Sequence, residues 1–331
     1  MDEDAPQNDD LATHSNDAFF KSIFSEPAHA VAFFKQHLPA DVAAQVDWSS
    51  LKVMPSSFVK KSLHQVHADL LFRVNVGGQD LMLYLLFEHQ SSVDRGLRLR
   101  LLGYVLEILQ HQLKKHGWPL APVLPFVFHQ GPDRWNVSTA FEDLFDLKGD
   151  LAGALTPFLP KFQHALLDLS VYDPAKDEDD AQLQIILQLM KLSRSKELLN
   201  FFAWWANSPY QEMPDSLLGR LLLYALHADS ELDVEQIFHK LSSNSELEKQ
   251  TMSVAEKLIA KGRTEGISQG ISQGISQGLS KGLWVGRVQT LQEFLQTPVT
   301  AAGILEEKSS EELETLHSLL HQSYQERFKK S

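Results

Sequence analysis

Two apolar segments separated by Gly77-Gly78 constrain the fold of this chain more than any other feature of its sequence. The segments, 67–76 and 79–90, are rich in leucine, valine and phenylalanine, as β-strands often are. A Gly-Gly pair suits the two-residue turn that joins neighbouring antiparallel strands. We therefore predict a β-hairpin in which Asp69 lies opposite Leu86.

The segments around the hairpin predict an α/β fold. A first helical element is expected over 16–38, with a break at Pro27, and a weak strand over 51–59. After the hairpin, the apolar spacing of 95–116 predicts a helix, and the short apolar run that ends at Phe128 predicts another strand. A strand, a helix and a strand in succession form a crossover within one sheet. The resulting order is an αβββαβ core with a mixed sheet, followed by a helical C-terminal region.

The composition along the chain indicates five parts. They are a disordered acidic N-terminus over 1–15, a core domain over 16–178, a helical region over 179–260, a glycine repeat over 261–287 and C-terminal helices over 288–331. The repeat has glycine at every fourth position, and each interior glycine costs a helix about 1 kcal/mol relative to alanine. Two interpretations stay open. The repeat is either a flexible linker or a helix that forms against a partner, which would make the chain a homo-oligomer through the repeat and the C-terminal helices.

The overall composition excludes several classes of protein. Hydrophobic residues make up 43% of the chain, and the absence of cysteine excludes disulfides, thiolate nucleophiles and cysteine-based metal sites. The N-terminal sequence is acidic where a signal peptide is basic, and no stretch approaches ~20 uninterrupted apolar residues. We therefore expect a soluble, cytoplasmic protein without a membrane partner.

Charge is distributed unevenly along the chain. The net charge of −13 argues against a nucleic-acid partner, but residues 51–135 carry 10 basic and 6 acidic side chains. A local excess of positive charge can bind a polyanion, although a fluctuation within a mixed-charge surface explains it equally well. The candidate phosphate contacts are Lys60, Lys61, Arg95, Arg98 and Arg100.

Polar side chains converge at one end of the predicted hairpin. The expected register places Glu88 one diagonal step from Asp69, and Gln90 shares their face because side chains alternate along a strand. Two carboxylates at this range can hold one hard cation through oxygen ligands. With a third polar residue to position water or to stabilise charge at phosphorus, the arrangement suits metal-dependent phosphodiester hydrolysis. Solvated surface acids remain the alternative.

Five sequence strings carry a resemblance to a known family. They are NDAFFKSIFSEP at 16–27, HADLLFRV at 67–74, LYLLFEHQSS at 83–92, LRLRLLGYVLEI at 97–108 and LPFVFHQGPDRW at 124–135. Together they resemble the recombination-promoting nuclease and transposase-like family (Rpn, YhgA-like), over about residues 16–260. That family is assigned to the PD-(D/E)XK nuclease superfamily, so the resemblance implies a PD-(D/E)XK-like nuclease domain over 16–178.

The resemblance assigns roles to three residues of the hairpin. It implies that Asp69 and Glu88 are the metal ligands and that Gln90 occupies the position of the superfamily's usual lysine. Glutamine lacks the positive charge that lysine would bring to the phosphate. The chain also departs from the family at Asn16, where histidine is usual.

Three further residues are possible supporting residues by the same resemblance. Asp17 matches the acid that the superfamily often carries on its first helix, although a helix cap explains it as well. Arg100 and Tyr104 match a family arginine and tyrosine, and their spacing of four places them on one helix face. Arg100 could meet the scissile phosphate or simply be solvated.

The function implied is that of a magnesium-dependent DNA endonuclease, with Mn²⁺ as a substitute, that promotes recombination through DNA breaks. Two other functions stay open. The glutamine at position 90 fits a catalytically weak or inactive protein that binds DNA or forms oligomeric interactions. A nuclease directed at RNA is the other.

Overall fold

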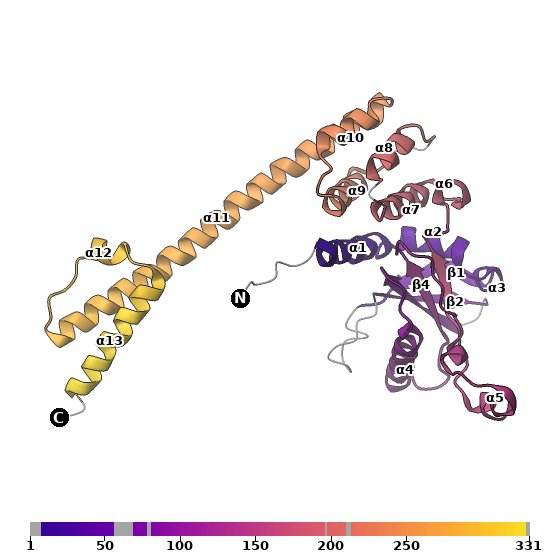
Figure 1. Cartoon of the computed structure of the whole chain (residues 1–331), viewed down its shortest axis with the longest axis horizontal. Coiled ribbons are helices and arrows are strands. Elements are labelled where there is room, and N and C mark those ends of the chain that lie inside the picture. The colour runs from indigo at the N-terminus through magenta and orange to yellow at the C-terminus, as the bar shows by residue number, and fades with distance from the viewer. Residues whose placement is uncertain (1–7, 56–68, 78–80, 196, 210–212, 329–331) are drawn as a thin grey trace. The chain divides into compact units, whose positions relative to one another are not determined.

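The computed structural model of the chain describes residues 8–55, 69–77, 81–195, 197–209 and 213–328. The chain divides into two units, Met1–Ala255 and Glu256–Ser331. The first unit combines a five-stranded sheet with helices, and the second is built from helices (Figure 1). The prediction of an α/β protein with a helical C-terminal region is confirmed.

The sheet of the first unit is mixed and has its strands in chain order. β1 (Val46–Val53), β2 (Leu70–Val76) and β3 (Leu81–Gln90) are antiparallel neighbours. β4 (Val123–His129) and β5 (Ala165–Asp168) are parallel to β3. The sequence predicted β2, β3 and β4, and it placed the first strand over 51–59, whereas β1 begins at Val46 and ends at Val53. It missed β5, whose four residues are too short to show a periodic pattern.

The hairpin forms where the sequence predicted it, but in another register. Leu70 pairs with Phe87, so Asp69, one residue before Leu70, faces Glu88 directly rather than diagonally. The prediction was wrong because residues 77–80, and not the glycine pair alone, connect the two strands. The correction brings the two carboxylates nearer to each other than expected.

Helices cover both faces of the sheet (Figure 1). α1 (Asn8–Phe24) and α2 (Pro27–His37) lie on one face, and α4 (Leu97–His116) lies on the other. Phenylalanine rings fill the first interface, where Phe24 and Phe33 lie 5.1 and 4.9 Å from the ring of Phe87 between centroids. Such aromatic pairs stabilise a core beyond the area that they bury.

The second face of the sheet is apolar where α4 covers it. Leu71, Tyr84 and Leu86 are buried there against α4. Acidic residues Asp69 and Glu88 lie at one end of this face, and Arg73 and Asn75 lie farther along it. α1 begins at Asn8, within the segment 1–15 that the sequence predicts to be disordered.

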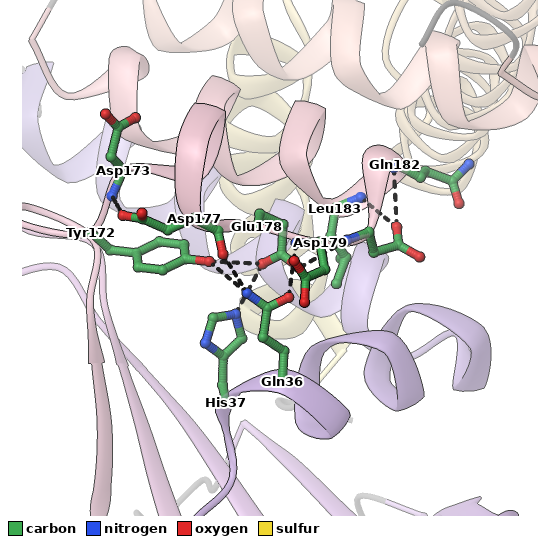
Figure 2. A network of polar contacts seen from close by, with 10 residues as sticks. Gln36, His37, Tyr172, Asp173, Asp177, Glu178, Asp179, Gln182 and Leu183 are labelled. Atoms are coloured by element: carbon green, nitrogen blue, oxygen red, sulfur yellow. Dashed lines mark hydrogen bonds and ion pairs between the residues drawn. The ribbon is translucent and has the colours of Figure 1, made fainter. Parts of the chain in front are cut away.

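Helices dominate the chain after β5. The longer ones in the first unit are α7 (Ala181–Ser193), α8 (Leu198–Ala206), α9 (Asp215–Ala228) and α10 (Val234–Leu241). Short helices α3 (Ala40–Ala43), α5 (Gly149–Leu155) and α6 (Pro174–Asp177) occupy connections. A polar network joins the end of α2 to the segment around α6, through Gln36, His37, Tyr172 and Glu178 (Figure 2).

The glycine repeat lies within a helix. α11 (Ser245–Leu295) contains the whole repeat and is followed by α12 (Ala302–Glu306) and α13 (Ser310–Phe328). The last part of α11 packs against these two helices through a small apolar cluster, which comprises Val285, Val288, Leu305 and Leu313. Across the described parts of the chain, each helix is too short or too polar to cross a membrane.

Candidate active site

The candidate site lies where β2 begins and β3 ends. Asp69 immediately precedes β2, and Glu88 and Gln90 are among the last residues of β3. The hairpin register places the two carboxyl groups across from each other. Helices α1 and α4, which cover opposite faces of the sheet, contribute Lys21 and Arg100 to the same end.

Asp69 is fixed by two contacts. Its Oδ2 accepts a hydrogen bond from the backbone N–H of His89 at 2.8 Å, and its Oδ1 lies 2.9 Å from Nζ of Lys21. Burial raises the pKa of Asp69, although the hydrogen bond and charge of Lys21 oppose this effect. The carboxyl group is therefore held in place, but its contacts do not fully offset the cost of burying its charge.

Glu88 is the acid of the site whose burial is least offset by hydrogen bonds and ion pairs. Its side chain is 5% exposed, and its Oε1 has two long contacts, 3.4 Å to Nε2 of Gln90 and 3.5 Å to Nη2 of Arg100. Its Oε2 is buried and has no hydrogen-bond partner among the residues that the structure describes. Burial, and then the negative charge of Asp69, raise the pKa of Glu88 to about 8, while Arg100 and a hydrogen bond from the backbone N–H of Asp69 act in the opposite direction.

The charges around the site do not balance. Four carboxylates and two cations gather there: Asp17, Asp69, Glu88, Asp94, Lys21 and Arg100. Full ionisation leaves an excess of two negative charges, which equals the charge of one divalent cation. The orphaned Oε2 of Glu88 and the facing Asp69 are oxygen donors of the kind that Mg²⁺ prefers.

A cation at this site would take few ligands from the protein. Over the described part of the chain, no group of three or more His, Cys, Asp or Glu side chains could hold a metal ion. Mg²⁺ commonly binds through one or two carboxylates and completes its shell with water and substrate phosphate oxygens. Asp69 and Glu88 fit that mode of binding.

Gln90 and Tyr104 belong to the surroundings of Glu88. Nε2 of Gln90 donates to the backbone oxygen of His89 at 2.8 Å and contacts Glu88 weakly. Tyr104 is buried in the core under α4, where burial, and then the charge of Glu88, raise its pKa to about 12. Its hydroxyl therefore stays protonated near neutral pH.

The predicted phosphate contacts have different positions. Arg95 is exposed at the start of α4, and Arg100 lies near Glu88, where Nη1 pairs with Asp94 at 2.7 Å. Arg98 departs from the prediction because it is buried, and its Nη1 donates to the backbone oxygen of Ala140 at 2.7 Å. Its role is to hold the start of α4 to the segment around Ala140. Lys60 and Lys61 lie outside the described residues.

Two residues beside the site have structural roles. The ring of His89 lies on the sheet face opposite to Glu88, 5.0 Å from the ring of Phe20, as strand alternation predicts. Its Nε2 pairs with Oε1 of Gln130 at 2.9 Å, and burial lowers its pKa to about 4. Asn16 is buried and accepts a hydrogen bond from the hydroxyl of Tyr224 at 2.5 Å.

Lys21 is the charged residue that sequence reasoning missed. Asp17 entered the prediction as a supporting acid, and in the structure it reaches the site through Lys21, whose Nζ lies 2.8 Å from its Oδ2. The spacing Asp17-x-x-x-Lys21 on a helix is the signal that could have indicated this ion pair.

A comparison with known families identifies the family of this chain. The family profile described as "Putative transposase, YhgA-like" matches residues 14–213. The chain belongs to this family. The match covers the sheet, both helices that contribute cations to the site, and α7 and α8.

Individual relatives carry nuclease names. Recombination-promoting nuclease RpnD of Escherichia coli O157:H7 is 27% identical over 249 residues, which cover 73% of this chain and 93% of the relative. Recombination-promoting nuclease RpnA of Escherichia coli K12 is 25% identical over 75% of this chain and 84% of the relative. The inactive recombination-promoting nuclease-like protein RpnE of the same strain is 26% identical over 76% of this chain and 83% of the relative. No solved structure matches the chain.

Proposed function

We propose that this protein is a magnesium-dependent DNA endonuclease with a PD-(D/E)XK-like active site formed by Asp69, Glu88 and Gln90. The observation that carries the proposal is the buried, unpartnered Oε2 of Glu88 opposite Asp69. A native protein rarely leaves a buried acceptor without a partner unless a ligand, an ion or water completes it. The names of RpnD and RpnA support phosphodiester cleavage as the chemistry.

Each residue of the site has a role in this proposal. Asp69 and Glu88 would hold Mg²⁺, or Mn²⁺ in its place, and the bound cation would stabilise the negative charge that develops on the scissile phosphate. Gln90 would orient the attacking water through its side-chain amide. Arg100, held by Asp94 and supported by Tyr104, would face the phosphate from the side of α4.

DNA would reach the site along the basic part of the chain. Arg95 is exposed beside Arg100, and Lys60 and Lys61 complete the proposed set of phosphate contacts. Contacts of this kind position a duplex without reading its sequence. The strand breaks would promote recombination, as the names of the relatives suggest.

One observation favours a second candidate function, that of an inactive DNA-binding or interaction protein. Gln90 is neutral, and the relative RpnE is named as inactive. The deciding experiment incubates the full chain with supercoiled plasmid and Mg²⁺, beside Asp69→Ala and an EDTA control. Nicking or linearisation by the wild type alone would support the nuclease, and binding without cleavage would support the second candidate. A parallel RNA substrate separates DNA from RNA as the target.

The second unit would mediate self-association into a homo-oligomer. Ile267 and Ile271 in the repeat are 56% and 59% exposed, and a glycine-rich helix gains stability by packing against a partner. Replacing both with serine should lower the mass measured by sedimentation equilibrium. Ile304→Ser in α12, which is also exposed, serves as the control. An unchanged mass in the double variant would argue against an oligomer that forms through Ile267 and Ile271.

A further inference from the structure

The position that usually carries an active-site lysine in the superfamily is neutral in this chain. Gln90 directs its Nε2 to the backbone oxygen of His89 at 2.8 Å and to Oε1 of Glu88 at 3.4 Å. An amide can orient water, but it brings no net charge to a phosphate. If the chain cleaves phosphodiesters, β3 alone does not supply the positive charge that the reaction requires.

Lys21 brings an ammonium group to the same carboxylates from a different element. Its Nζ lies 2.9 Å from Oδ1 of Asp69 and 2.8 Å from Oδ2 of Asp17. The preceding residue, Phe20, packs 4.8 Å from the ring of Phe87 between centroids, which fixes the position of α1 over β3. The core packing of the neighbouring residue therefore determines the position of Lys21.

The ammonium group is held but remains accessible. An ammonium has three N–H donors, and the two carboxylates can take two of them. The side chain of Lys21 is 38% exposed, so a substrate can approach it from solvent. When a cation shares Asp69, the contact with Asp17 still keeps Lys21 at the site. Asp17 is therefore a positioning residue for Lys21.

The other cation of the site has a different main partner. Nη1 of Arg100 lies 2.7 Å from Asp94, whereas its contact with Glu88 is 3.5 Å. In contrast, Lys21 lies within 2.9 Å of Asp69. Lys21 is the cation in tighter contact with the candidate metal ligands.

We infer that Lys21 is a catalytic residue, which contacts the scissile phosphate and supplies from α1 the positive charge that Gln90 lacks. The inference rests on the proposed nuclease function and deepens it. Lys21 on α1, rather than the residue at position 90 on β3, would then place the positive charge beside this pair of acids.

The test is a charge-relocation experiment on the full chain, with plasmid cleavage in Mg²⁺ as the activity. Lys21→Met should lower the cleavage rate by about 100-fold, which is the usual cost of removing one group that stabilises transition-state charge. Lys21→Arg should retain most of the rate. Adding Gln90→Lys to Lys21→Met should restore the rate at least about tenfold, because a lysine then returns beside the same carboxylates. Lys35→Met, at an exposed lysine of α2, is the matched control.

Melting temperatures and cleavage rates together distinguish a catalytic role of Lys21 from a structural one. If Lys21 is catalytic, the rise in melting temperature with Mg²⁺ should persist in Lys21→Met, since Lys21 is not a proposed ligand. Lys21→Met that cleaves at the wild-type rate overturns the inference and leaves the nuclease proposal intact. A loss that neither Lys21→Arg nor Gln90→Lys relieves overturns it too, because the requirement is then not for charge. A wild type that matches Asp69→Ala would instead refute the nuclease itself.

Discussion

Two buried glutamates of the first unit have opposite surroundings. The side chain of Glu178 is 0% exposed, and its Oε2 is met by Nε2 of His37 at 2.9 Å and by the hydroxyl of Tyr172 at 3.3 Å (Figure 2). Its Oε1 accepts from the backbone N–H of Asp180 at 3.3 Å. Glu88 is almost as buried, yet it has two long contacts and one oxygen with no partner in the described structure.

The difference is the one expected between a structural acid and an acid that binds a ligand, which is the role proposed for Glu88. At Glu178 the fold itself supplies the hydrogen bonds that offset the cost of burial. Burial and the neighbouring Glu178 also raise the pKa of Tyr172, which keeps its hydroxyl a donor. At Glu88 the contacts that the fold supplies are longer and leave Oε2 without a partner in the described structure, which is the basis of the proposal that a cation binds there.

The largest expected effect is on catalysis. Asp69→Ala and Glu88→Ala should each lower Mg²⁺-dependent plasmid cleavage by about 1,000-fold or more, because a bound cation contributes several kcal/mol to transition-state stabilisation. Gel quantification of nicked and linear plasmid measures the rates, and circular dichroism checks the fold. Wild-type rates in both variants would remove the metal pair from the mechanism.

Replacing Glu178 should lower the stability of the protein, whereas replacing Glu88 should not. Glu178→Ala should lower the free energy of unfolding by about 3 kcal/mol, because it leaves His37 and Tyr172 without their buried acceptor. Glu88→Gln should cause no loss in metal-free buffer, since it removes an uncompensated acid. Urea unfolding of the three proteins gives the values. Equal destabilisation by both substitutions would contradict the comparison.

Metal binding should stabilise the wild type through Glu88 and Asp69. At a Mg²⁺ concentration of 100 times Kd, mass action contributes about 2.7 kcal/mol, which differential scanning fluorimetry detects as a higher melting temperature. Asp69→Ala should show no such rise, and Glu178→Ala should keep it from a lower starting point. A rise of equal size in Asp69→Ala would place the cation elsewhere.

A last effect concerns pH in buffer that contains EDTA. The pKa of Glu88 rises from 4.5 to about 8 on folding, so the native state binds more protons than the unfolded state between these values. This contribution to stability is complete below pH 4.5 and is lost as pH rises through about 8. Unfolding free energies measured from pH 5 to 8 should fall about 1 kcal/mol per pH unit more steeply in the wild type than in Glu88→Gln. Parallel curves would show that folding does not raise the pKa of the Glu88 carboxyl group.

Local pattern predicted the elements that form the site, but not all of its contacts. The alternation of side chains along a strand and the turn glycines were enough to predict β2 and β3. They also predict that the side chains of Glu88 and His89 lie on opposite faces of the sheet. The register failed because the length of the connection over 77–80 depends on where strand pairing stops. That stop is a property of the assembled sheet and not of the turn residues.

Contacts between distant segments were harder to predict. Lys21 reaches Asp69 only because phenylalanines pack α1 on the sheet, and the buried contact of Arg98 with Ala140 depends on the path of the chain after β4. Periodicity assigns a side chain to a face of its own helix but does not say what covers that face. Asp17 and Arg100 were predicted because they match family residues, whereas Lys21, although it lies in the same string as Asp17, was not assigned a role.

The repeat in α11 gives the length of this helix an unusual way to vary. Its unit Ile-Ser-Gln-Gly occurs three times in direct succession over 267–278, and a Cβ added at Gly262, Gly266 or Gly278 would meet no atom within 4 Å. Tandem coding repeats gain and lose whole copies during replication, and four residues keep the reading frame. One copy more or less would change the helix by about 6 Å and rotate everything beyond it by about 40° about the helix axis. A change in copy number would thus alter the length of α11 and the rotation of its end about the axis in one step.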